Sequence, residues 1–202
     1  MTAPPRVFIS ATSGDLRGVR QIVKEALLTI GCLPVEQTHF GPDWRTVSGM
    51  LHAKIADCQA LIHIAGMRYG AEPDPATLPP DAPRRSYTQM EYGIGRQLHA
   101  ERGDDGFRVY TFVCPEGFPF DLPLDAEGQP AGPEAEEKAR LQRAHRAALL
   151  GGEAVYGEPR DAVHLQSSIL ALKEEVLALR REQVAVREEV RGARKRDRKS
   201  VV

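Results

Sequence analysis

Ala60-Leu61-Ile62-His63-Ile64-Ala65 decides the fold, because this run is apolar at every position but one. A strand with one wet face alternates apolar and polar residues, whereas a continuous apolar run is typical of a strand covered on both faces. Such strands belong to parallel sheets with helices on both sides. We interpret His63, the one interruption, as a core or strand-end histidine and not as a catalyst.

Upstream of this run, the chain twice shows a strand followed by a helix. Residues 6–10 form a short β-rich run, and residues 11–15 supply turn and helix-start chemistry. Apolar side chains then recur at spacings of three and four over residues 16–30, which predicts an amphipathic helix. A second strand is predicted at 32–35, before a helix that Asp43 can cap.

Downstream of the run, residues 67–85 are irregular and contain five prolines. A helix from Ser86 to about residue 101, a strand at 107–114, a helix at 134–150 and a short strand at 154–156 complete the body. The sequence therefore predicts an α/β fold, an open and mainly parallel sheet with helices on both faces. Ligands in such folds bind beyond the carboxyl ends of the strands, which here adjoin the start of the Ser86 helix.

The last part of the chain, residues 161–202, has a different pattern, and we predict a second unit there after a domain at 1–160. Its apolar positions follow a three-four alternation over three heptads, which indicates a C-terminal coiled-coil helix. Gln183 is the one polar member of this seam. Two alternatives stay open: a helix packed along its own domain, and a stalk to a downstream module. The seam comprises Ile169, Leu172, Val176, Leu179, Gln183, Val186 and Val190.

Composition limits the classes of protein to consider. The 202 residues are 42% hydrophobic and 27% charged, which is ordinary for a globular protein. No apolar run is long enough to span a bilayer and the first residues lack a signal-peptide core, so we expect a cytoplasmic protein with no membrane partner. The three cysteines are far apart in apolar surroundings, which predicts reduced thiols and no metal site.

Charge is distributed unevenly along the chain. The net charge of -1 divides into -4 for residues 1–160 and +3 for residues 161–202. The acidic body argues against nucleic acid as a partner. Six of the nine residues at 191–199 are Lys or Arg, and we interpret this basic end of the coiled-coil helix as solvated, although it has the composition of an RNA or membrane contact.

The densest cluster of polar and aromatic residues is the run from Ser86 to Tyr92. Ser86 and Gln89 form an S-x-x-Q capping box for the helix that begins there. Glu91 is not needed for capping, and it lies four residues after Tyr87, on the same helix face. From the residues alone, an early-helix glutamate is more often a surface residue favoured by the helix dipole than a catalyst.

Three segments together resemble the signature of the DUF4062 family, a TIR-like family: residues 7–10 with 15–16, residues 66–70, and residues 86–92. They occur in the expected order over about residues 6 to 100. The resemblance implies a TIR or flavodoxin-like sheet. It also implies chemistry at one carboxylate, because TIR enzymes cleave the nicotinamide N-glycosidic bond of NAD and the related nucleoside deoxyribosyltransferases use a glutamate in a comparable place.

By this resemblance, Glu91 is the candidate catalytic residue, and NAD is a substrate and not a cofactor. NAD-cleaving TIR domains often have Trp four residues before the glutamate, where this chain has Tyr87. For Ser10, Asp15 and Arg68 the alternative roles are a turn residue, a helix-start acid and a surface charge. The candidate substrate-binding residues are Phe8, Ser10, Asp15, Arg68, Tyr69 and Tyr87.

Beside NAD cleavage, two other functions remain open for this chain. The first interpretation is an NAD-cleaving TIR-like effector, by hydrolysis or cyclisation, that is activated by forming a homo-oligomer through the TIR-like domain and the coiled coil; a role in immune defence comes from the resemblance alone. A non-catalytic TIR-like adaptor for homotypic protein interaction has the same fold. A nucleoside deoxyribosyltransferase-like enzyme would use the same pocket. The chain has no Gly-x-Gly-x-x-Gly or Walker loop to favour redox or P-loop chemistry.

Overall fold

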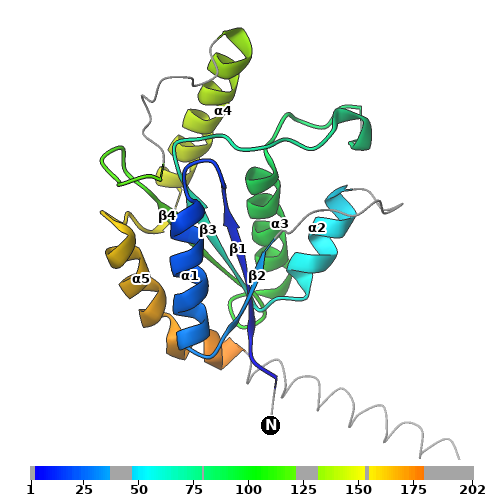
Figure 1. Ribbon diagram of the computed structural model, residues 1–202. Coiled ribbons are helices and arrows are strands. Elements are labelled where there is room, and N and C mark those ends of the chain that lie inside the picture. Colours follow the sequence, from blue (N-terminus) through cyan, green and yellow to red (C-terminus); the bar gives the residue numbers. More distant parts are fainter. Residues whose placement is uncertain (1–2, 37–46, 79, 122–131, 153–154, 180–202) are drawn as a thin grey trace, which may run out of the picture.

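A parallel sheet in the order β2-β1-β3-β4-β5 runs through the computed structural model, and Figure 1 shows how the helices surround it. The structure describes residues 3–36, 47–78, 80–121, 132–152 and 155–179. The α/β class with a parallel sheet, predicted from sequence, is confirmed. The strands are β1 (Arg6–Ala11), β2 (Leu33–Glu36), β3 (Ala60–Ala65), β4 (Arg108–Val113) and β5 (Val155–Gly157).

The strand order creates a switch point between β1 and β3. The chain leaves β1 for β2 on one side, then returns to add β3 on the other side of β1. The helices that follow β1 and β3 therefore pack on opposite faces, and the loops diverge at the carboxyl ends of these two strands. All six residues of β3 are buried, as the apolar run predicted. Ser10 of β1 lies beside His63 of β3 in the register.

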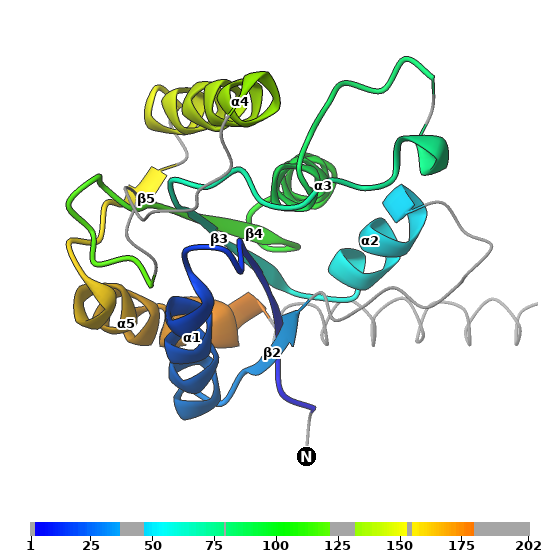
Figure 2. The ribbon, with the colours of Figure 1, turned by 45° about the horizontal axis from the view of Figure 1, so that its top comes forward.

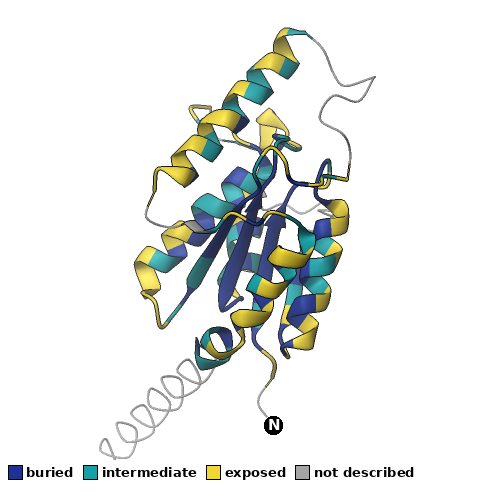
Figure 3. Ribbon diagram, turned by 90° about the vertical axis from the view of Figure 1, so that its left-hand side faces the viewer, coloured by how far each residue is buried: buried dark blue, intermediate teal, exposed yellow. Residues whose placement is uncertain are grey.

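Helices cover both faces of the sheet (Figure 2). The helices α1 and α5 pack together on one face, and α2 and α3 pack together on the other. Each pair closes its own apolar core against the buried strands, which Figure 3 shows in dark blue. The helices are α1 (Arg17–Thr29), α2 (Val47–Ala56), α3 (Tyr87–Arg102), α4 (Pro133–Leu150) and α5 (Ala162–Ala171), with a short 3-10 helix η1 (Pro75–Thr77) in the Pro-rich loop.

The predicted coiled-coil seam belongs, as far as it is described, to the core of the α/β domain. Ile169, Leu172, Val176 and Leu179 are buried in the same cluster as the apolar face of α1. This stretch is thus a helix packed along its own domain, which was one of the alternatives to a coiled coil. The packed unit continues past residue 160, where the sequence predicted a domain boundary. A three-four spacing serves a sheet-facing helix and a coiled coil alike. The remaining seam positions, Gln183, Val186 and Val190, lie outside the described residues.

Candidate functional site

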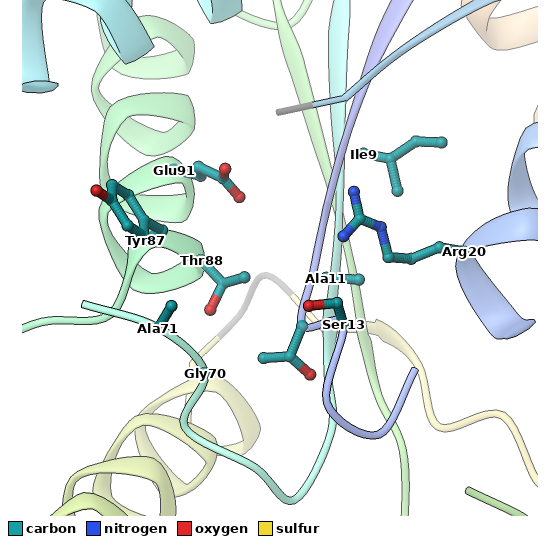
Figure 4. A pocket seen from close by; sticks show the side chains of 10 residues that line it. Ile9, Ala11, Ser13, Arg20, Gly70, Ala71, Tyr87, Thr88 and Glu91 are labelled. Carbon is teal, nitrogen blue, oxygen red and sulfur yellow. The ribbon is translucent and has the colours of Figure 1, made fainter. Parts of the chain in front are cut away.

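A pocket of about 440 Å³ opens beside the carboxyl end of β1 and the first turns of α3 (Figure 4). This is the edge at which parallel α/β sheets bind ligands. Its walls come from β1 and the turn after it, from α1, from the loop after β3, and from α3. The lining residues are Ile9, Ala11, Thr12, Ser13, Arg20, Gly70, Ala71, Tyr87, Thr88 and Glu91.

The start of α3 is fixed from two sides, which sets the direction of the residues that follow. The Ser86 hydroxyl accepts a hydrogen bond from the Gln89 amide at 3.4 Å, so the predicted N-cap is confirmed. The Tyr87 amide donates to the carbonyl of Ala71 at 2.9 Å, which ties the loop after β3 to the helix. One turn further, Glu91 faces β1 and not the solvent.

Glu91 is a buried carboxyl in the pocket wall, with 2% of its surface exposed. Burial raises the pKa of Glu91 to about 7, against the smaller opposing effects of the nearby Ser10 hydroxyl and of the charges of Arg20 and Lys54. The carboxyl therefore changes its charge closer to neutral pH than a free glutamate does. A group that changes charge near neutrality inside a pocket has the properties of a catalytic acid or base.

Tyr87 lines the same wall one turn before Glu91, with its ring beside the carboxyl-bearing helix face (Figure 4). The ring is partly buried against the core between α2 and α3. Burial and the charge of Asp74 raise the pKa of Tyr87, so the phenol stays neutral at physiological pH. The residue thus presents an aromatic face and not a charge, as its place in the sequence suggested.

Arg20 of α1 supplies a positive charge opposite Glu91, and Figure 4 shows its guanidinium directed toward β1. A guanidinium nitrogen lies 3.3 Å from Glu36 Oε1, and Lys24 lies 2.9 Å from the other Glu36 oxygen. The sequence reasoning did not select Arg20, because a lone arginine on an amphipathic helix is ordinary. Only its position could have identified Arg20, because α1 directly follows β1, a strand at the switch point. The pocket hydroxyls of Thr12, Ser13 and Thr88 were missed as well.

Ser10 and Asp15 are both fully buried, in different roles. The Ser10 hydroxyl lies 3.1 Å from His63 Nδ1 on β3 and 3.3 Å from the Thr88 carbonyl oxygen on α3. Asp15 lies behind the pocket wall, where its carboxylate accepts hydrogen bonds from the Thr12 hydroxyl and from the amides of Met67 at 2.8 Å and Arg68 at 3.0 Å. It therefore braces the turn after β1 against the loop after β3.

Of the six predicted substrate-binding residues, only Tyr87 lines the pocket, and Ser10, Asp15, Phe8, Arg68 and Tyr69 do not. Phe8 is fully buried in the core between β1, α2 and α3. Arg68 lies beside the turn at Gly14, with its Cδ 3.2 Å from where a Cβ would stand there. Tyr69 is buried, and burial followed by the charge of Glu72 raises its pKa. Of the predicted substrate-binding residues, Tyr87 thus shares the pocket wall with Glu91, and Ser10 lies near Glu91 but outside the pocket lining.

The described residues show neither a cluster of metal ligands nor a membrane-spanning helix. Within them, no group of three or more His, Cys, Asp or Glu side chains is placed to hold a metal ion. The three cysteines are buried free thiols. None of the described helices is both long and apolar enough to cross a membrane.

A family model matches residues 6–102, from the first residue of β1 to the last residue of α3. All the pocket-lining residues lie inside this match. The model is described as "Domain of unknown function (DUF4062)". No curated protein matches the chain. Through residues 6–102, the chain belongs to the DUF4062 family.

Proposed function

We propose that this protein is a TIR-like enzyme that cleaves the nicotinamide N-glycosidic bond of NAD, with Glu91 as the catalytic carboxylate. One observation carries the proposal: Glu91 is buried in the wall of a pocket at the switch point and is still ionisable near neutral pH. An early-helix glutamate held in bulk solvent, with no concavity beside it, would have given the proposal no site.

The chemistry requires a negative charge beside the ribose. When neutral nicotinamide departs, the ribose ring develops the positive charge of an oxocarbenium ion. A carboxylate fixed in a site poor in water stabilises that charge more strongly than water does, and it can instead attack the ribose carbon or bind its hydroxyls. The positively charged nicotinamide ring of bound NAD also favours the ionised form of Glu91, and would lower its pKa from about 7.

The remaining walls suit a nucleotide. Tyr87 offers an aromatic face for a planar ring, and Arg20 places positive charge on the opposite side, where it suits a phosphate. The hydroxyls of Thr12, Ser13 and Thr88 can bind ribose hydroxyls. The volume of about 440 Å³ lies within the roughly 300 to 1,000 Å³ of small-molecule sites.

We further propose that the enzyme is active as a homo-oligomer in the cytoplasm, in an immune-defence setting. The residues of the seam up to Leu179 are buried within their own domain. Association through the described part of the chain would therefore use surfaces of the α/β domain other than this seam.

The experiment is incubation of concentrated protein with NAD, with chromatography of nicotinamide, ADP-ribose and cyclic products. We expect nicotinamide release, and a loss of about 100-fold or more in Glu91→Gln, which keeps the side-chain size. Glu101→Gln, which removes an exposed carboxylate from the same helix, is the matched control. Unchanged NAD with demonstrated oligomers would support the adaptor instead, and cleavage of nucleosides but not NAD would support the deoxyribosyltransferase.

A further inference from the structure

The helix α4 is attached to the rest of the domain mainly by polar and charged side chains. Of its 18 residues, all of which the structure describes, only Gln142 and Leu149 are buried. Leu149 packs in a small apolar cluster with Ala65 and Val113. Figure 2 shows α4 on the same side of the sheet as α3. A helix that buries so little apolar surface depends on its polar contacts to stay in place.

The loop that follows β3 forms one wall of the pocket. We call residues 66–72 the wall loop, since Gly70 and Ala71 within it line the pocket. A Cβ at Gly70 would stand 3.0 Å from Cγ2 of Thr12, another lining residue. The Ala71 carbonyl accepts a hydrogen bond from the Tyr87 amide at 2.9 Å. The shape of the pocket therefore depends on where the wall loop lies.

Two side chains of α4 hold the start of the wall loop by its backbone. Gln142 Nε2 donates to the Gly66 carbonyl at 2.8 Å. Arg146 Nη1 donates to the carbonyls of Ala65 at 3.1 Å and Gly66 at 3.2 Å. Gln142 is 3% exposed, and its Oε1 accepts from Gln89 Nε2 of α3 at 3.5 Å. These bonds lie where the chain leaves β3 and enters the wall loop.

Two charged side chains of α4 hold the other end of the wall loop. Glu72, its last residue, pairs with Arg84 at 2.6 Å and with Lys138 of α4 at 3.6 Å. Arg84 also pairs with Glu134 of α4, which lies 3.3 Å from Lys138. Two positive and two negative charges thus form one network. The four side chains are between 22% and 64% exposed, so each pair is weak alone and is screened by salt.

We propose that α4 is a strap that holds the wall loop at both ends, so that docking of α4 closes the pocket wall and release of α4 opens the pocket. Hydrogen bonds to carbonyls and exposed ion pairs are exchanged for contacts with water at a small net cost, which makes the release reversible. The strap lies outside the family match at 6–102, whereas the wall loop and Arg84 lie inside it. An event at α4 can therefore act on the pocket without contacting Glu91.

This coupling works in both directions. If docking of α4 favours the closed pocket, a ligand that fills the closed pocket favours the docked α4 by the same factor. The strap goes beyond the proposed function, because it concerns the wall loop and does not require that the ligand be NAD.

The test is amide hydrogen exchange, measured by NMR on the full chain without ligand. Three amides report on the wall loop. Those of Met67 and Arg68 are hydrogen-bonded to Asp15, and that of Tyr87 is hydrogen-bonded to the wall loop itself. Amides within α4 report on the strap. None of these measurements uses NAD, so failure of the strap and failure of NAD cleavage are separate results.

Two changes release the strap at different ends. Glu134→Gln together with Lys138→Gln removes one charge of each sign from the network, so the net charge is kept. Gln142→Leu removes the bond to the start of the wall loop and keeps a side chain of similar size. In both proteins we expect the amides of α4 and of the wall loop to exchange faster by about fivefold or more. Glu137→Gln with Arg140→Gln is the matched control, because this pair, 2.7 Å apart, joins two residues of α4.

Opening of the pocket is measured with a thiol placed in its wall. Thr88→Cys puts this thiol on α3 among the lining residues, and the native cysteines are buried, so iodoacetamide modifies the new thiol first. We expect the rate of modification to rise by about fivefold or more in both released proteins, and to stay unchanged in the control. High salt should also raise the rate when the network is intact, and should raise it less when the network has been removed. Faster exchange in α4 with unchanged wall-loop exchange and an unchanged modification rate would overturn the proposal.

Discussion

Glutamine at position 91 keeps the shape of the glutamate side chain but cannot ionise, so this substitution isolates the cost of holding a charge in the pocket wall. The Glu91 carboxyl is 2% exposed, and burial is the largest influence on its pKa. We expect Glu91→Gln to become more stable than the wild type as the pH rises, because only the wild type must ionise a buried group.

The size and sign follow from linkage. The pKa of Glu91 is raised from 4.5 to about 7 on folding, so between these pH values the folded state binds more protons than the unfolded state. The free energy of unfolding therefore falls as the pH rises through this window and levels off above it. At about 1.4 kcal/mol per pH unit, the loss is about 3 kcal/mol, and the variant, which has a neutral amide in place of the carboxyl, does not undergo it.

The assay is urea unfolding followed by circular dichroism, at a series of pH values from about 4.5 to about 8. The difference in free energy of unfolding between variant and wild type should grow by about 3 kcal/mol in favour of the variant across this range. Glu101→Gln, on the same helix but exposed, should show no such growth. A difference between Glu91→Gln and wild type that stays constant with pH would refute the idea that burial raises the Glu91 pKa.

Three further outcomes follow from the same structure. If the carboxylate is the active form of Glu91, nicotinamide release measured by chromatography should rise with pH through about 7 and then level off, whereas a falling rate would point to the protonated form. Leu172→Ala should cost about 2 to 5 kcal/mol in urea unfolding, equally at all protein concentrations, since its packing partners lie in the same domain; a cost that depends on concentration would indicate an intermolecular seam instead. Gly66→Ala should cost about 1 to 3 kcal/mol, because a Cβ there would clash with Asp15 Oδ2 and displace the carboxylate that holds the turn after β1 to the loop after β3. Gly117→Ala, where a Cβ meets open space, is its control in thermal melts, and equal melting temperatures would contradict the reasoning.

Local patterns in the sequence predicted most of the fold. The unbroken apolar run of β3 requires cover on both faces, and the strand-helix alternation leaves few topologies besides a parallel sheet. The S-x-x-Q motif placed the start of α3 because capping is chemistry between near neighbours. The partner of the helix at 162–171 is not a local property, so its periodicity could not distinguish α1 from a second chain.

For the site as well, residues within one local segment could be predicted, whereas residues brought in by other elements could not. Glu91 and Tyr87 were found because both belong to one short segment at the predicted ligand edge. Arg20 comes from another helix, α1, and its relation to Glu91 depends on how that helix packs. Phe8 lies on the same face of β1 as Ser10, but it is two residues further from the carboxyl end of the strand and is fully buried in the core between β1, α2 and α3.

The extent of the packed unit has a practical consequence for expressing fragments of this protein. The family match ends at residue 102, before β4, which pairs with all six residues of β3, and before α5, which covers α1. A polypeptide cut at the end of the match would leave the central strand with an unpaired edge and would expose a large apolar surface to water. We expect such a fragment to aggregate. The stretch that matches the family model is thus shorter than the packed unit, and recombinant versions need to extend at least to Leu179.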